Sequence, residues 1–157
     1  MFTLAVMYGI GCERGDKKNG TKLDFIDIRR AFFHARAKRS IYVELPPEEA
    51  QEGMCGQLNK AMYCTRDAAQ NWEFAYAEYM EELGFIRGTA SPCLFWHPGR
   101  ELSVVVHGDD FTILGWEHQL DWFREKMNKT IENKHRGRIG PHPNDNKAIR
   151  ILNRVVE

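Results

Sequence analysis

The sequence predicts an α+β fold in which helices pack on one face of an antiparallel sheet. Short β-branched and apolar runs occur in adjacent pairs, as at residues 103–106 and 111–114. Two longer segments, residues 67–84 and 120–131, carry apolar side chains at helical spacing. Hydrophobic residues make up 43% of 157 residues, which is enough for a domain with a real core. This composition excludes a disordered chain and a coiled coil.

The first half of the chain predicts short strands separated by polar connections. Residues 22–28, KLDFIDI, predict a strand, and the alternation of side chains places Asp24 and Asp27 on opposite faces. Residues 40–45 predict a second strand from their β-branched and aromatic content. Residues 54–63 carry a weaker strand signal around the letters CGQL.

Residues 67–84 form the clearest predicted helix. Aromatic and apolar side chains recur along it at three- and four-residue steps, and this spacing indicates a face that packs on a core. Asp67 and Gln70 form a D-x-x-Q capping box, and Gly84 supplies a C-cap. The same helical spacing over residues 120–131 predicts a second helix that packs on the sheet.

Strands and a loop complete the second half of the chain. Residues 91–97 predict a strand that pairs with a strand over residues 102–106, because consecutive strands tend to be neighbours. Residues 134–143 are basic and rich in glycine and proline, and predict a loop or hairpin bend with solvated histidines. Residues 149–156 predict a final short strand.

Residues 103–115, SVVVHGDDFTILG, contain the main candidate for a functional site. Gly108 and Asp109 form a Gly-first two-residue turn between two apolar runs, which predicts a II′ hairpin with Asp109 and Asp110 at its tip. Adjacent carboxylates repel each other, so they need either water or a divalent cation. From these residues alone, a solvated turn and a metal site both remain open. Asp27, at the end of its strand, is equally compatible with a helix N-cap and with a third metal ligand.

Composition bears on partners and compartment. Lys plus Arg equals Asp plus Glu at 22 each, so the net charge indicates no polyanionic partner. Residues 29–39 carry five basic and no acidic side chains, and residues 124–150 carry eight basic against three acidic ones. Either stretch could follow a phosphate backbone, although charge runs are commonly solvated faces.

The four cysteines show no metal-ligand spacing and predict an intracellular protein with reduced thiols. No segment, including the apolar residues 1–12, reaches transmembrane length.

Four ordered motifs resemble the Ty1/copia-type retrotransposon reverse transcriptases. The stretch DIRRAFFHARAKRSIYVELPPE, from Asp27, resembles the family segment that opens with an aspartate and ends in a tyrosine-bearing strand with proline. The stretch QLNKAMYCTRDAAQNW is similar to the family's KLNKALYGLKQAPRAW-type sequence, and the run ASPCLFW follows it. VVHGDDFTILG stands where the family has its Y-x-D-D hairpin, with His107 in place of the tyrosine. The resemblance extends from residue 23 to residue 156.

The resemblance implies an RNA-directed DNA polymerase and assigns roles to individual residues. The catalytic ligands of two Mg²⁺ or Mn²⁺ ions would be the three acids Asp27, Asp109 and Asp110. Ala31 would border the incoming nucleotide, and Phe32 would lie under its sugar and reject a 2′-hydroxyl. Leu152 and Asn153 would belong to the hairpin that grips the primer end.

The resemblance also implies a domain organisation and a set of partners. Residues 1–157 would form a single, partial reverse transcriptase palm domain, with fingers and thumb truncated or absent. The partners would be an RNA or DNA template-primer, deoxynucleotides and the remaining Pol segments, integrase and ribonuclease H, with no membrane. Two alternatives use the same residues: a catalytically inactive retroelement remnant that folds and binds nucleic acid, and a metal-dependent nuclease or phosphohydrolase.

Overall fold

The computed structural model describes residues 20–151 and 153–156, and the predicted α+β class with an antiparallel sheet is confirmed. The chain divides into two compact units. The first combines the described residues up to Arg29 with those from Met80 onward, and the second is Arg30–Tyr79. No helix among the described residues is long and apolar enough to cross a membrane. Residues 1–12, including Cys12, lie outside the described part of the chain.

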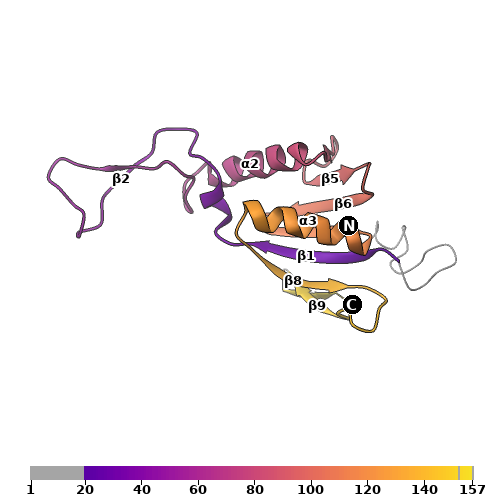
Figure 1. The fold of residues 1–157 in the computed structure, drawn as a ribbon. Coiled ribbons are helices and arrows are strands. Elements are labelled where there is room, and N and C mark those ends of the chain that lie inside the picture. The colour runs from indigo at the N-terminus through magenta and orange to yellow at the C-terminus, as the bar shows by residue number, and fades with distance from the viewer. Residues whose placement is uncertain (1–19, 152, 157) are drawn as a thin grey trace. The chain divides into compact units, whose positions relative to one another are not determined.

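The first unit is built on a six-stranded antiparallel sheet with the order β4-β5-β6-β7-β1-β8 (Figure 1). Its strands are β1 (Lys22–Ile28), β4 (Ile86–Arg87), β5 (Leu94–His97), β6 (Leu102–His107), β7 (Asp110–Gly115) and β8 (Asn133–Ile139). The strand predicted over residues 22–28 is confirmed, and so is the pairing expected between residues 91–97 and 102–106, which joins β5 to β6. β4 is a short strand that the sequence analysis missed.

The helix α3 (Glu117–Thr130) lies along one face of this sheet (Figure 1). Its buried side chains Leu120, Phe123 and Met127 recur at three- and four-residue steps, which confirms the predicted amphipathic helix. The ring of Phe123 meets that of Phe85, with centroids 5.6 Å apart. The apolar side chains of α3 therefore pack against those on the facing side of the sheet and form a core from which water is excluded.

A hairpin of two short strands covers the other face of β1. β9 (Ile149–Ile151) pairs with β10 (Arg154–Val156), and a buried cluster forms with residues of β1, β7, β8 and β9. The cluster consists of Leu23, Phe25, Leu114, Ile139 and Ile149, with Ile151 and Val156 packed against it. The single strand predicted over residues 149–156 is wrong, because the chain reverses at Asn153, which adopts a left-handed φ of 62° that asparagine tolerates.

The loop predicted over residues 134–143 is wrong for its first half, which forms β8 at the edge of the sheet. β8 pairs antiparallel with β1, with Leu23 opposite Ile139 and Asp27 opposite Lys134. The register shifts by one residue in the middle of this pairing, which is a β-bulge. The glycine that suggested a loop, Gly137, lies at this bulge.

A buried carboxylate on the α3 face joins β1, β8 and α3. Asp24 is 1% exposed, is hydrogen-bonded to the ring of His135 and accepts a hydrogen bond from Arg138 at 3.0 Å. Arg138 also donates to Asp121 of α3 at 2.8 Å. Burial by itself raises the pKa of Asp24, but the hydrogen bonds from His135 and Arg138 and their charges outweigh it, and the pKa lies below its ordinary value. The solvated histidine predicted at His135 is therefore wrong.

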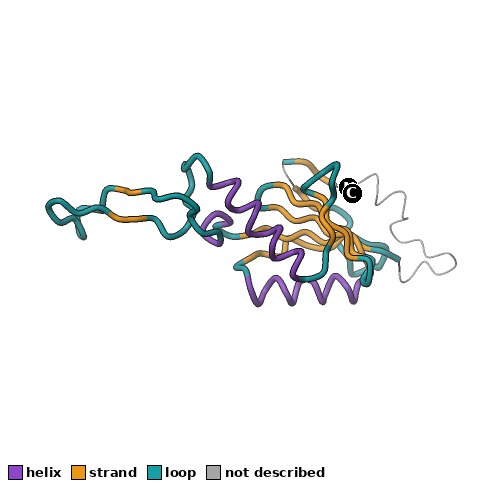
Figure 2. The backbone as a smooth tube through the Cα atoms, turned by 90° about the horizontal axis from the view of Figure 1, so that it is seen from above, coloured by secondary structure: helices purple, strands orange, loops and turns teal. Residues whose placement is uncertain are grey.

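The second unit contains η1 (Ala31–His34), the paired strands β2 (Tyr42–Val43) and β3 (Gly56–Gln57), and most of α2 (Ala68–Glu82). Figure 2 shows β2 and β3 as two short strands within a long loop. The strand predicted over residues 40–45 is thus shorter than expected, whereas the predicted helix over residues 67–84 is confirmed. Asp67, just before α2, accepts hydrogen bonds from Arg39 at 3.0 Å and Asn71 at 3.2 Å.

We expect Asp24→Asn to lower the free energy of unfolding by about 3 kcal/mol, because it removes the buried partner of Arg138. The pKa of Asp24 lies below 3.8 in the folded chain, so its ionised form stabilises the fold above that pH and the contribution is lost as the pH falls through and below it. Urea titrations near neutral pH and at about pH 3 measure both effects. The variant should lose less stability on acidification than the wild type, and an equal loss would contradict this.

We expect Gly137→Ala to destabilise the fold by about 2 kcal/mol. Gly137 has a φ of 147°, and a Cβ there would lie 2.8 Å from Cδ1 of Ile149 and 2.9 Å from Oδ1 of Asn146. Gly108→Ala is the matched control, because Gly108 also has a positive φ, 64°, but a Cβ there meets nothing within 4 Å. Thermal unfolding of both variants separates the contact from the backbone strain. Equal losses of stability would show that β8 is not packed at Gly137.

Candidate active site

The turn between β6 and β7 carries two of the predicted acids. Gly108 has a φ of 64°, the conformation that the first central residue of a II′ turn requires. Asp109 is exposed, and Asp110 is half-buried at the start of β7. His107, which ends β6, lies directly opposite Asp110. The hairpin predicted from the sequence, with acids at its tip, is confirmed.

The register of β1 and β7 brings Asp27 beside Asp110. The two residues are partners across the antiparallel pair, and the Ile28 N–H donates to the Asp109 carbonyl at 2.8 Å. This bond marks Asp27 and Asp110 as a non-hydrogen-bonded pair, in which the Cα atoms are only about 4.5 Å apart and the side chains are closest. Like charges placed directly opposite each other destabilise a sheet. The carboxylates of Asp27 and Asp110 therefore repel each other at this position of the sheet.

The electrostatics of Asp110 reflect this crowding. Burial raises the pKa of Asp110, and the negative charges of Asp109 and Asp27 raise it further. The positive charges of Arg136 and His107 act in the opposite direction. The three acids predicted from the sequence thus lie within electrostatic reach of one another.

Arg136 is a site residue that the sequence analysis missed. Its guanidinium forms a hydrogen-bonded ion pair with Oδ2 of Asp27. The nearby glycine and proline residues predict a loop at this position. The basic side chains of Lys134, Arg136 and Arg138 have the period of two of a β-strand. This spacing does not mark one face, because the bulge directs Arg136 to Asp27 and Arg138 to Asp24 on the other face.

The donor chemistry of the site fits a divalent cation. Carboxylate oxygens are the ligands that Mg²⁺ and Mn²⁺ prefer, and the raised pKa of Asp110 marks negative charge that a cation would offset. The carboxylate of Asp27, however, already forms an ion pair with Arg136. Within residues 20–151 and 153–156, no three His, Cys, Asp or Glu side chains are grouped closely enough to hold one metal ion.

A cavity of about 240 Å³ opens beside Asp110. Its walls come from β1, β7, β8 and the β9–β10 hairpin, and consist of Phe25, Asp110, Phe111, Thr112, Arg136, Arg150, Ile151 and Asn153. Asn153, which the resemblance assigns to the primer hairpin, therefore lines the same cavity as Asp110, and its side chain accepts a hydrogen bond from Arg150. Leu152 lies outside the described residues.

The two residues assigned to the nucleotide, Ala31 and Phe32, belong to η1 in the second unit. Ala31 is buried there, and the ring of Phe32 lies 4.5 Å from that of Tyr63, centroid to centroid. These contacts explain how η1 is held within its own unit. The role of both residues beside a nucleotide stays a prediction.

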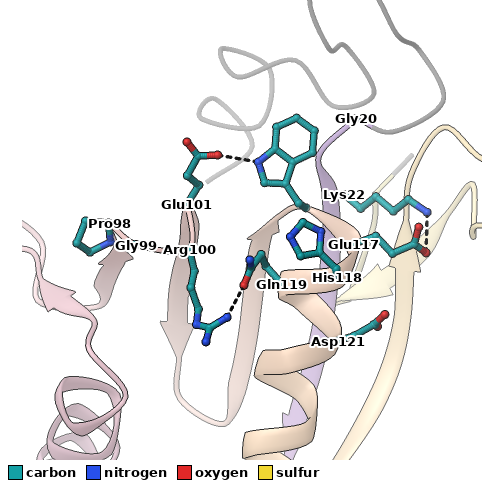
Figure 3. A pocket seen from close by; sticks show the side chains of 11 residues that line it. Gly20, Lys22, Pro98, Gly99, Arg100, Glu101, Glu117, His118, Gln119 and Asp121 are labelled. Carbon is teal, nitrogen blue, oxygen red and sulfur yellow. Dashed lines mark hydrogen bonds and ion pairs between the residues drawn. The ribbon is translucent and has the colours of Figure 1, made fainter.

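A larger cavity, of about 740 Å³, lies at the end of β1 away from Asp27 (Figure 3). It is lined in part by Lys22, which is about 17 Å along the strand from Asp27. Several of its polar side chains pair with one another: Lys22 with Glu117 at 3.0 Å, Arg100 with Gln119 at 2.8 Å, and Trp116 with Glu101 at 2.8 Å. None of the predicted acids lines this cavity.

Comparison with known families bears on what the opposed acids are for. The family model described as reverse transcriptase (RNA-dependent DNA polymerase) matches residues 17–142, which is most of the chain. The chain belongs to the reverse transcriptase family. The matched range contains β1, the β6–β7 hairpin and β8, so the elements that position Asp27, Asp110 and Arg136 are all part of the family's domain.

A curated relative agrees with the resemblance to Ty1/copia-type retrotransposon sequences. The chain is similar to the Retrovirus-related Pol polyprotein from transposon TNT 1-94 of Nicotiana tabacum, with 24% identity over 105 residues. The match covers 63% of this chain and 8% of the relative. The chain thus matches only a small part of the relative's length.

We expect Asp110→Asn to stabilise the metal-free chain by about 0.5 kcal/mol. Folding raises the pKa of Asp110, so its ionised carboxylate opposes folding at neutral pH, and a neutral amide relieves this repulsion. Thermal unfolding in the presence of a chelator measures the change. Glu125→Gln, which removes an exposed carboxylate that pairs with Lys129 on α3, is the control and should bring no gain. A loss of stability in Asp110→Asn would contradict the repulsion between the opposed acids.

Proposed function

We propose that this chain carries the catalytic carboxylates of an RNA-directed DNA polymerase that uses two divalent metal ions for nucleotidyl transfer. The observation that carries the proposal is the register of β1 and β7, which opposes Asp27 and Asp110 next to Asp109. Membership of the reverse transcriptase family supports the reaction class. The proposed reaction is attack of a primer 3′-hydroxyl on the α-phosphate of a deoxynucleotide, with release of pyrophosphate.

In this proposal Asp27, Asp109 and Asp110 hold two Mg²⁺ or Mn²⁺ ions. When bound, such ions lower the pKa of the attacking hydroxyl and offset the charge of the phosphates. The chain itself contributes position: Asp27 and Asp110 stand on paired strands, so backbone hydrogen bonds hold the spacing between them. The half-buried setting of Asp110 keeps the carboxylate partly desolvated, which strengthens its attraction for a cation.

The proposed partners are an RNA or DNA template-primer and deoxynucleotides. The cavity shared by Asp110, Arg150 and Asn153 supports a primer end at this position, because it adjoins the acids and offers a guanidinium to a phosphate. Ala31 and Phe32 remain the proposed contacts of the nucleotide. The relative's name, a Pol polyprotein, supports further Pol segments such as integrase and ribonuclease H as partners.

A second candidate function is that of a catalytically inactive remnant that folds and binds nucleic acid. The ion pair between Arg136 and Asp27 favours it, because a guanidinium holds a carboxylate that the polymerase proposal assigns to the metal ions. Lys134 and Arg150 add positive charge near the same face. Salt-dependent binding of an RNA–DNA duplex without incorporation of nucleotides would support this candidate.

A primer-extension assay on an RNA template with Mg²⁺ or Mn²⁺ tests the polymerase proposal. We expect Asp110→Asn to reduce incorporation at least about a hundredfold, because one of the proposed metal-binding carboxylates loses its charge. Glu125→Gln, which changes an exposed carboxylate on α3, should leave incorporation unchanged. Activity that persists in Asp110→Asn would refute the assignment of the acids. A wild-type chain that binds the duplex but incorporates nothing would favour the inactive remnant.

A further inference from the structure

Arg136 reaches the acids because of the bulge in β8. Phe25 pairs with Gly137 and Ile26 pairs with His135, so Arg136 is the additional residue between two consecutive positions of β1. Bulges of this kind redirect a side chain and are over-represented beside active sites. Here the redirected side chain is a guanidinium, and it contacts Asp27.

The bulge is anchored by contacts of its own. A Cβ at Gly137 would lie 2.8 Å from Ile149 and 2.9 Å from Asn146, so the backbone passes close to the β9 side of the unit at a position that favours glycine. The Asn146 N–H donates to the Arg138 carbonyl at 2.9 Å, and the Arg138 N–H donates to Oδ1 of Asn146 at 3.3 Å. Arg136 is therefore presented by a defined backbone and not by a loose loop.

The guanidinium and a divalent cation compete for the same carboxylate. Arg136 takes Oδ2 of Asp27, and its charge also acts on Asp110. A cation shared by Asp27 and Asp110 would lie close to this guanidinium, and like charges at that range repel. The Arg136–Asp27 ion pair therefore weakens the binding of a cation by both carboxylates, and opening of the pair relieves this competition.

The surroundings allow Arg136 to leave Asp27 without burying its charge. Its side chain is 46% exposed, and it lines the cavity of about 240 Å³ that also reaches Asp110. A guanidinium that moves into this space stays in contact with water. Opening then costs mainly the free energy of the ion pair. For a partly exposed pair this free energy is small, so binding of a divalent ion can offset it.

We propose that Arg136 is a displaceable counter-cation, which holds Asp27 when no divalent ion is bound and thereby sets the metal affinity of the three acids. The inference rests on the proposed function of Asp27, Asp109 and Asp110 as metal ligands. It adds a residue that regulates their occupancy: the Asp27 carboxylate is paired with Arg136 without metal and exchanges one cation for another when metal binds.

Titration of the 157-residue chain with Mn²⁺ alone, followed by the EPR signal of free Mn²⁺, tests this proposal. We expect Arg136→Gln to tighten Mn²⁺ binding about fivefold, the effect of losing one partly exposed ion pair. Arg136→Lys keeps the charge and should bind Mn²⁺ like the wild type. Lys134→Gln is the matched control, because Lys134 lies on the same strand opposite Asp27. This variant removes one positive charge, as Arg136→Gln does. Its Mn²⁺ affinity should change less than twofold.

Each outcome decides the inference. Unchanged or weaker Mn²⁺ binding in Arg136→Gln overturns it, and so does a gain in Lys134→Gln as large as that in Arg136→Gln, which would report general charge and not the ion pair. Circular dichroism of each variant confirms that the fold is intact. Asp110→Asn separates the inference from the proposed function: loss of Mn²⁺ binding there places the ion at the acids whatever Arg136 does. Tighter binding in Arg136→Gln without RNA-templated extension would uphold the inference while refuting polymerase activity.

Discussion

The antiparallel register of β1 and β7 is the constraint on which the rest of the site depends. It places Asp27 directly opposite Asp110, and the hydrogen bond from Ile28 to the Asp109 carbonyl keeps the pair in register at the turn. A shift by one residue would turn every side chain of β1 to the other face and separate the two acids. The sheet thus uses main-chain hydrogen bonds to maintain a side-chain arrangement that repels itself.

β1 carries two acids whose charges are compensated in different ways. Asp24, on the α3 face, is fully buried and has fixed partners in His135 and Arg138, which make it part of the structure. Asp27, on the opposite face, is partly exposed and pairs with the guanidinium of Arg136 from the bulge. Buried charges need permanent partners, whereas a partly exposed charge can exchange one partner for another. This difference separates a structural carboxylate from one suited to bind a cation.

Much of the site was predictable because its signals are local. A β-branched run on either side of Gly108 predicts the hairpin, and the period of two along residues 22–28 predicts opposite faces for Asp24 and Asp27. The β8 strand was not predictable in this way, because its bulge breaks the alternation at Gly137 and because glycine ordinarily indicates a turn. The local pattern also did not predict the hairpin of β9 and β10, which only the family resemblance implied, because its turn at Asn153 depends on a left-handed residue other than glycine.

The sequence by itself determined the fold class, the acidic hairpin and the family resemblance, since these depend on residue order and periodicity within short stretches. Only the tertiary structure decided which strands are neighbours and, through the β8 bulge, that Arg136 meets Asp27 from 109 residues away. It also decided that His135 and Arg138 compensate Asp24. Such contacts depend on strand order and register, which arise from the packing of the whole unit and leave no local pattern in the chain.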